Sequence, residues 1–333
     1  MSPSSSRRGI DVLNKAELPA CHHLVQVERN MNTVQPTPTP FGYFYGPTAT
    51  SQKLNPNFAT INTTDTWNAD AHYEALHVSM SRPLLKGLQV QGSYAFAKSI
   101  DNSSSTSSVT AGTGYPSAIG NPAPLFPEIN KGLSDYNLRN NGTLSLVYDV
   151  PGWNTKMKPL HFVTSGWESG TIFHTQSGLP FTPVLSADQA GETKADTTGT
   201  ALGERPNLVL SSDCTNPVTG NINGYVNASC YTYPAPVTYN GVKGTVLGNV
   251  ARNSLIAPGL TNLDFSLIKN DKITERFTTQ FRFEFFNILN HPNFAAPATS
   301  IFDGNGNLVS NFGRITSTTN QGRQIQFGLK IRF

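Results

Sequence analysis

A pair of opposite charges two positions apart is the first arrangement in this sequence that could do chemistry. Arg282 and Glu284 lie in a run where apolar and polar residues alternate, so a strand there points both side chains to one face. Such a pair could transfer protons or hold a charged substrate. A salt bridge between them is the interpretation we favour, because that face of the strand is polar.

Two other groups have residue types that bind metals. Cys21, His22 and His23 are contiguous, but no second pair of ligands accompanies them, and a closed zinc site needs four. Residues 303–307 combine Asp, Gly and Asn as a calcium loop does, but they lack the Glu that would complete the site, so a tight turn is predicted. The sequence also contains no phosphate-binding loop, dinucleotide-binding glycine pattern or hydrolase motif. We therefore predict no catalytic residue, no cofactor, no metal and no enzymatic activity.

Two cysteines share one long polar stretch of the chain. In an oxidising compartment Cys214 and Cys230 could form a disulfide, and two free thiols are the alternative. Aromatic residues of the same stretch could contact a ligand from outside: Tyr225, Tyr231, Tyr233 and Tyr239.

The elements that carry these residues are predicted to be strands, and the last stretch of the chain is the clearest. Apolar residues there alternate with polar residues or glycine, so one face of the strand is apolar and the other polar. About ten residues is the length that a tilted strand needs to cross a bilayer. A half-buried strand of a soluble protein could show the same alternation. The apolar members are Ile325, Phe327, Leu329, Ile331 and Phe333.

Six further strands are predicted upstream. They are Tyr73–Arg82, Leu88–Lys98, Thr143–Val150, a poorly alternating segment at about 162–176, Leu263–Leu267 and Phe277–Phe285. The connections alternate between short turns and long polar regions, the latter at about 99–137, 177–260 and 291–322. This rhythm is typical of transmembrane barrels, which have short turns on one side of the membrane and long loops outside. We therefore predict an all-β fold: an antiparallel transmembrane β-barrel, of which 61–333 supplies about seven C-terminal strands, preceded by an irregular segment at 1–60.

Composition agrees with a β-rich chain that has long polar loops. The chain is 37% hydrophobic and only 14% charged, and its formal net charge of +3 is too small to indicate a nucleic-acid partner. No apolar run reaches the length of a transmembrane helix, and the N-terminal residues lack the apolar core of a signal peptide.

Several sequence blocks, in this order and spacing, resemble the C-terminal barrel of Oar-like TonB-dependent transporters of the acidobacterial type. The blocks are Trp67–Leu76, Tyr94–Asp101, Tyr148–Pro151, Gly166–Trp167 with Gln176–Phe181, Phe281–Phe294, and Phe312–Thr316 followed by Arg323–Phe327. The final strand, which ends on Phe333, resembles the assembly signal of outer-membrane barrels. The resemblance implies a barrel of about 22 strands around a plug. It also implies uptake of bulky ligands across the outer membrane of a Gram-negative bacterium, driven by the inner-membrane TonB complex.

The expected partners follow from this resemblance. They are outer-membrane lipid, the barrel assembly machinery, an unknown ligand, and the TonB complex through N-terminal parts that this sequence lacks. Because no plug or TonB-contacting segment is recognisable, the chain is expected to be a truncated or split product. The alternative is a secreted β-sandwich adhesin or glycan-binding module, in which the apolar faces of two sheets meet each other.

Overall fold

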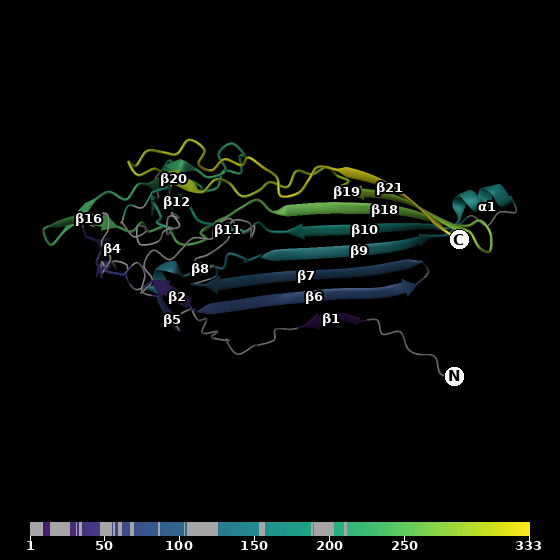
Figure 1. The fold of residues 1–333 in the computed structure, drawn as a ribbon, viewed down its shortest axis with the longest axis horizontal. Coiled ribbons are helices and arrows are strands. Elements are labelled where there is room, and N and C mark those ends of the chain that lie inside the picture. The colour runs from purple at the N-terminus through teal and green to yellow at the C-terminus, as the bar shows by residue number, and fades with distance from the viewer. Residues whose placement is uncertain are drawn as a thin grey trace.

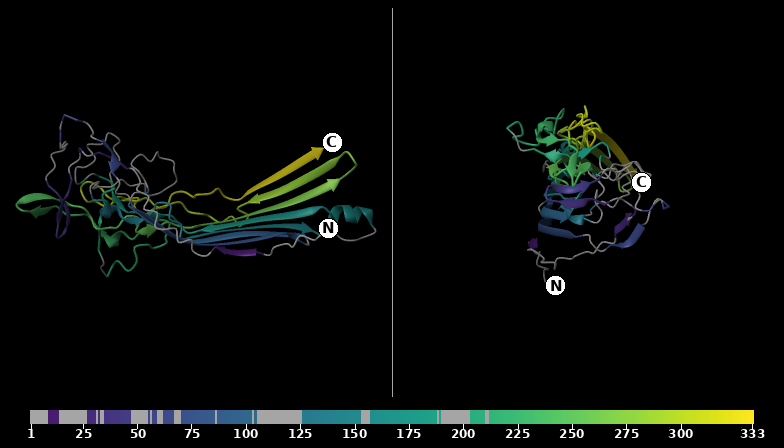
Figure 2. Two further views of the ribbon diagram at one scale, coloured as in Figure 1. Left: turned by 90° about the horizontal axis from the view of Figure 1, so that it is seen from below. Right: turned by 90° about the vertical axis from the view of Figure 1, so that its left-hand side faces the viewer.

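A long antiparallel sheet dominates the computed structural model, and its strands run side by side for most of the length of the molecule (Figure 1). The structure describes residues 9–13, 27–30, 32, 35–46, 55, 57–58, 62–66, 70–85, 87–102, 104, 126–152, 157–187, 189, 203–209 and 212–333. In order across the sheet, the strands are β1 (Gly9–Leu13), β6 (Ala71–Leu85), β7 (Leu88–Asp101), β9 (Asn140–Val150), β10 (Trp167–Gln176), β18 (Leu260–Lys272), β19 (Thr278–Phe286) and β21 (Gln324–Arg332). The sheet curves (Figure 2) but stays open, with β1 and β21 at its edges.

All seven predicted strands are present, and the predicted all-β antiparallel fold is confirmed. Two predicted boundaries are wrong. The strand expected at about 162–176 is β10, which begins only after the helix α1 (Lys158–Thr164). The strand predicted at Leu263–Leu267 is β18, which continues to Lys272 because Asn270–Lys272 pair with Thr278–Gln280. Backbone pairing needs no apolar side chains, so a strand can continue into polar residues that are typical of a turn.

The N-terminal segment is less irregular than predicted. In the described part of 1–60 the structure has β1 and three further short strands, β2 (Val27–Asn30), β3 (Thr37–Thr39) and β4 (Gly42–Tyr45). β1 extends the long sheet, with Ile10 opposite Met80 of β6. Each of these strands has at most five residues, which is too short for an alternating pattern to stand out in the sequence.

The register of the sheet separates an apolar face from a polar face. Residues directly opposite each other point to the same side. Leu146 of β9 lies opposite Val90 of β7, and Phe283 of β19 lies opposite both Leu267 of β18 and Phe327 of β21. The apolar residues of seven strands therefore form one continuous surface, which we call the apolar face.

A buried lysine interrupts the apolar face at the end where α1 lies. Lys269 points to this face, but its ammonium donates to the carbonyl oxygens of Phe162 at 2.8 Å and Ser165 at 3.0 Å, and it pairs with Asp271. It also lies 4.9 Å from the ring centre of Phe162 and 5.5 Å from that of Trp167. Carbonyls at the C-terminal end of a helix favour a cation, so α1 provides this charge with partners.

At the opposite end, the long connections fold together into what we call the loop cap, the described parts of 126–139, 177–259 and 287–323 (Figure 1). Its secondary structure comprises η1 (Pro127–Asn130), β8 (Gly132–Leu133), β11 (Pro180–Phe181), β12 (Val184–Leu185), β13 (Asn207–Leu208), η3 (Ala228–Cys230), β14 (Tyr231–Thr232), β15 (Val237–Tyr239), β16 (Val242–Val246), β17 (Leu255–Ile256) and β20 (Ser300–Phe302). β12 pairs with β20 in parallel and joins two separate connections. β16 pairs with β4, and β2 pairs with β5 (Asn62–Thr66).

The loop cap has a hydrophobic core of its own. The buried members are Phe181, Leu185, Cys214, Val226, Cys230, Tyr231, Val250, Leu255, Ala257, Ile301, Phe302 and Phe312. They come from the second and third long connections, which were predicted only as polar stretches.

No helix in the described part of the chain is long and apolar enough to span a membrane.

Candidate functional site

The apolar face is unusually exposed. On β21 the side chain of Leu329 is 60% exposed and that of Phe327 is 70% exposed, and apolar residues of β6, β7, β9 and β19 on the same face are exposed as well. A soluble protein rarely leaves a continuous apolar surface of this extent uncovered, because its contact with water is unfavourable. The opposite face carries polar residues, such as Gln326 opposite Glu284. A sheet with one apolar and one polar face suits a barrel wall that has hydrocarbon on one side and water on the other.

The five residues predicted to form the assembly signal lie at the edge of the sheet. Ile325, Phe327, Leu329 and Ile331 pair with Phe285, Phe283, Phe281 and Thr279 of β19, and Phe333 follows β21 and is 94% exposed. The rings of Phe283 and Phe327 meet edge to face, with centres 5.6 Å apart. The alternation in the sequence is therefore the alternation of the two faces.

Six buried polar residues connect the loops of the cap. We call this group the loop clamp; it consists of Asp101, Asn130, Asp135, Arg205, Arg252 and Asn253. They come from the end of β7, from η1 and the segment after β8, and from the long connection between β10 and β18. Sequence reasoning did not identify this group.

Arg252 is the centre of the loop clamp, and its guanidinium is shared among three segments. Its Nε donates to the carbonyl oxygen of Asn130 at 2.8 Å, and its Nη1 donates to Oδ1 of Asp135 at 3.2 Å. Its Nη2 donates to the carbonyl oxygen of Asp101 at 3.0 Å and also to the carboxylate of that residue. The planar fork of arginine carries five N–H donors in fixed directions, so one side chain can hold acceptors from several segments at once.

Two neighbours complete the loop clamp. Asn253 donates through Nδ2 to Oδ1 of Asp135 at 2.6 Å and to the carbonyl oxygen of Leu133 at 2.7 Å. Arg205 donates through Nη2 to Oδ1 of Asn130 at 2.6 Å. Since the carboxylates are engaged by Arg252 and Asn253, the arrangement is suited to fixing loops in place.

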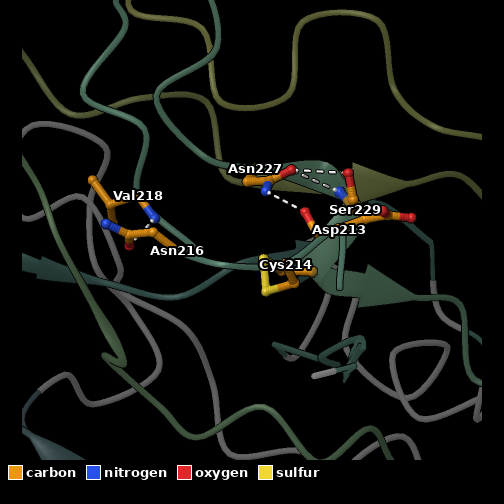
Figure 3. Close-up of a disulfide and its surroundings, with 7 residues drawn as sticks. Asp213, Cys214, Asn216, Val218, Asn227 and Ser229 are labelled. Atoms are coloured by element: carbon orange, nitrogen blue, oxygen red, sulfur yellow. Dashed lines mark hydrogen bonds between the residues drawn. A yellow bond between two sulfur atoms is a disulfide. The ribbon is translucent and has the colours of Figure 1, made fainter. Parts of the chain in front are cut away.

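A disulfide lies in the core of the cap. The structure joins Cys214 to Cys230, with Cα atoms 4.8 Å apart (Figure 3). Around it, Asn227 donates to the carbonyl oxygen of Asp213 at 3.2 Å and accepts from the backbone nitrogen of Ser229 at 3.1 Å. The bridge therefore closes a loop whose ends are already held together by hydrogen bonds.

The loop tyrosines pack within the cap. Tyr231 is only 4% exposed, and burial raises its pKa from 10.0 to about 12. The hydroxyl of Tyr225 donates to the carbonyl oxygen of Ile256 at 3.0 Å, and that of Tyr233 donates to Gly304 at 3.1 Å. Tyr239 packs against Phe41 and Phe44 of the N-terminal segment, whose strand β4 pairs with β16 of the cap. These contacts assign the tyrosines to the framework of the cap.

The remaining chemical candidates have structural roles or lie elsewhere. The predicted salt bridge between Arg282 and Glu284 is not formed; Nε of Arg282 donates instead to Oε1 of Gln280 at 2.9 Å. Asp303 closes a turn by accepting from the backbone nitrogens of Asn305 and Asn307, both at 2.9 Å, and hydrogen bonds from Asn307 lower its pKa. The segment 21–23 lies outside the described residues.

Comparison with known protein families decides the identity of the fold. Residues 20–326 match a family described as an outer membrane beta barrel domain. The chain belongs to this family. Searches of curated proteins and of solved structures gave no match.

As an outer-membrane barrel protein, the chain belongs in the outer membrane, and its apolar face is the side that contacts lipid. A β-sandwich would need a second sheet packed on this face. In the described part of the chain the apolar side chains of β21 are instead exposed. The sandwich alternative is therefore not supported.

Proposed function

We propose that the chain forms part of the wall of a TonB-dependent transporter of the Oar-like type, which takes up a ligand across the outer membrane. The observation that carries the proposal is the loop cap. It is a folded unit with its own core at one end of a barrel wall, while α1 and short turns occupy the other end. A pre-formed loop surface can bind a ligand without first paying the entropy of ordering the loops.

The open sheet supports a larger barrel. In lipid the backbone groups at the edges of β1 and β21 need partner strands, because no water is present to satisfy them. Under this proposal the seven long strands are one section of the wall, and other strands of the same transporter close it. The proposed partners are outer-membrane lipid at the apolar face, the barrel assembly machinery at β21, and the TonB complex as energy source. The proposed role of the chain is non-enzymatic.

A transport experiment tests this function even though the ligand is unidentified. The gene for this chain and the gene for TonB are deleted separately in the source bacterium, and the depletion of solutes from the medium is followed by mass spectrometry. We expect at least one solute whose uptake is lost in both strains and restored by complementation. If no uptake is lost in common, the chain does not serve TonB-dependent transport.

A further inference from the structure

Strands β10, β18, β19 and β21 run side by side up to the loop cap (Figure 1). A groove lies at this end of the sheet, on its polar face. We call it the amide groove, and its volume is about 360 Å³, which is within the range of small-ligand sites. Its lining residues are His174, Leu260, Asn262, Asp264, Phe286, Asn287, Asn320, Gln321, Gly322 and Gln324.

The strand residues of the groove share one face because of the register. His174 lies opposite Asn262, and Phe286 lies opposite Gln324. The polar face is the side away from lipid. The amide groove therefore lies on the water-filled side of the wall, directly below the loop cap.

Hydrogen bonds fix the framework of the groove. Oδ1 of Asp264 accepts from Nδ2 of Asn262 and from the backbone nitrogen of Asn287, both at 2.8 Å. Asn287 is 4% exposed and donates through Nδ2 to the carbonyl oxygens of His291 at 3.1 Å and Gln321 at 3.2 Å. The exit of β19 and the segment before β21 are thus tied together, so the groove exists before any ligand arrives.

Some polar atoms of the groove are left for a ligand. Oδ1 of Asn320 is shielded from solvent and has no hydrogen-bond partner in the described part of the chain. Only one oxygen of the Asp264 carboxylate is used by the bonds above. Leaving a shielded acceptor unsatisfied is unfavourable, so a rotation of the Asn320 amide that brings this oxygen into the groove, where a ligand hydroxyl donates to it, is favoured.

The lining chemistry selects one class of ligand. Asparagine and glutamine side chains offer both donors and acceptors, which suits hydroxyl groups because these also act as both. The described lining contains no lysine or arginine, which disfavours anions. Leu260 and Phe286 are its only large apolar members, which leaves little room for lipids or for the side chains of peptides.

We propose that the amide groove binds an uncharged polyhydroxylated ligand, an oligosaccharide, during uptake. This inference rests on the proposed transport function, because it names the class of ligand that the transporter takes up. Hydroxyl groups of the sugar donate to Asn320 and Asp264, and the ring of Phe286 lies against an apolar face of the sugar.

Binding is measured on the full chain, folded in lauryldimethylamine oxide, a detergent without a sugar headgroup. The probes are maltotetraose, cellotetraose and xylotetraose, with tetra-alanine and citrate representing neutral peptides and anions, and saturation-transfer NMR reports contact. Asn320→Leu and Asn262→Leu remove groove hydrogen bonds. Gln326→Leu is the matched control, because Gln326 lies on the same face of β21 outside the groove.

We expect at least one oligosaccharide to bind, with affinity reduced about tenfold by Asn320→Leu and unchanged by Gln326→Leu. Heat-dependent mobility on gels reports whether each variant is folded. If Asn320→Leu does not fold, the affinity of Asn262→Leu for the sugar tests the groove instead. The proposal is overturned if folded protein binds none of the sugars, if it prefers citrate or tetra-alanine, or if the groove variants bind as the control does. If the protein binds a sugar but the two deletion strains lose uptake of no common solute, only the transport proposal is rejected. If the two strains do lose uptake of a common solute but the protein binds no sugar, only the groove proposal is rejected.

Discussion

Nη1 of Arg252 lies 3.2 Å from Oδ1 of Asp135, a residue 117 positions earlier in the chain, and both side chains are almost completely buried. This contact joins two of the long connections that form the loop cap. Because the charges are removed from water, loss of one partner leaves the other buried without compensation.

Arg252→Met should therefore open the loop cap. Breaking a buried ion pair of this kind costs about 3–5 kcal/mol, and the carboxylates of Asp101 and Asp135 would then draw water into the cap. Limited trypsin digestion of folded protein in detergent, read by mass spectrometry, should show faster cleavage in the cap and unchanged strands. Arg276→Met, in an exposed turn, is the control. Equal cleavage of the two variants would show that Arg252 does not hold the loops.

Leu329→Lys should reduce membrane insertion, whereas Gln326→Lys should not. The two residues lie on opposite faces of β21. A lysine on the lipid face costs about 2–4 kcal/mol at the bilayer midplane, while the polar side tolerates charge. Outer-membrane levels of the two variants, compared in one expression host, measure the difference. Equal levels would mean that both faces have similar surroundings, which is incompatible with a barrel wall.

Deleting Phe333 should lower the amount of protein in the outer membrane more than it lowers synthesis. The residue is almost fully exposed beyond β21, so its removal takes away little packing in the folded chain. Quantitative immunoblots of membrane and total fractions give the ratio. An unchanged ratio would argue against recognition of this terminus by the assembly machinery.

Cys214 and Cys230 should be oxidised in the mature protein. In the chain-entropy model a loop of this length gives about 3 kcal/mol of stabilisation. A thiol-reactive reagent applied to unfolded, unreduced protein should label neither position, and reduction before labelling should expose both. Labelling of both cysteines without reduction is the contrary result. The Cys214→Ser, Cys230→Ser double variant should unfold in the cap at lower denaturant concentration.

The stability of the loop cap should fall at alkaline pH. Burial raises the pKa of Tyr231 from 10.0 to about 12, so the folded state holds this proton more tightly than the unfolded state. Its contribution is fully present below pH 10 and is lost as the pH rises through about 12. Ultraviolet absorbance of tyrosinate and cap proteolysis over this range should change together. Tyr231→Phe should remove this part of the pH dependence, and an unaltered profile would exclude Tyr231 as its source.

The alternating strands could be predicted from the sequence alone, for a local reason. Side chains of a strand alternate between faces, so Ile325, Phe327 and Leu329 mark the apolar side of β21 whatever strand pairs with it. The same alternation located the other long strands and placed Gln326 on the polar face. It was weakest at β10, where Ile172 points to the face opposite Trp167 and Phe173.

The contacts that hold the loop cap together can be seen only in the tertiary structure. Arg252 meets Asp101 across 151 positions, and Asn253 meets Thr182 across 71; such separations leave no period or spacing in the sequence. The sequence alone allows the loop tyrosines to contact a ligand, yet in the structure Tyr231 packs edge to face against Phe312 from another connection. Likewise, Asn262 and Asn320 border one groove only because β18 and the segment before β21 are brought together by the intervening β19. A strand's two faces follow from the backbone of that strand, whereas a buried polar cluster forms only where distant segments are brought together by folding.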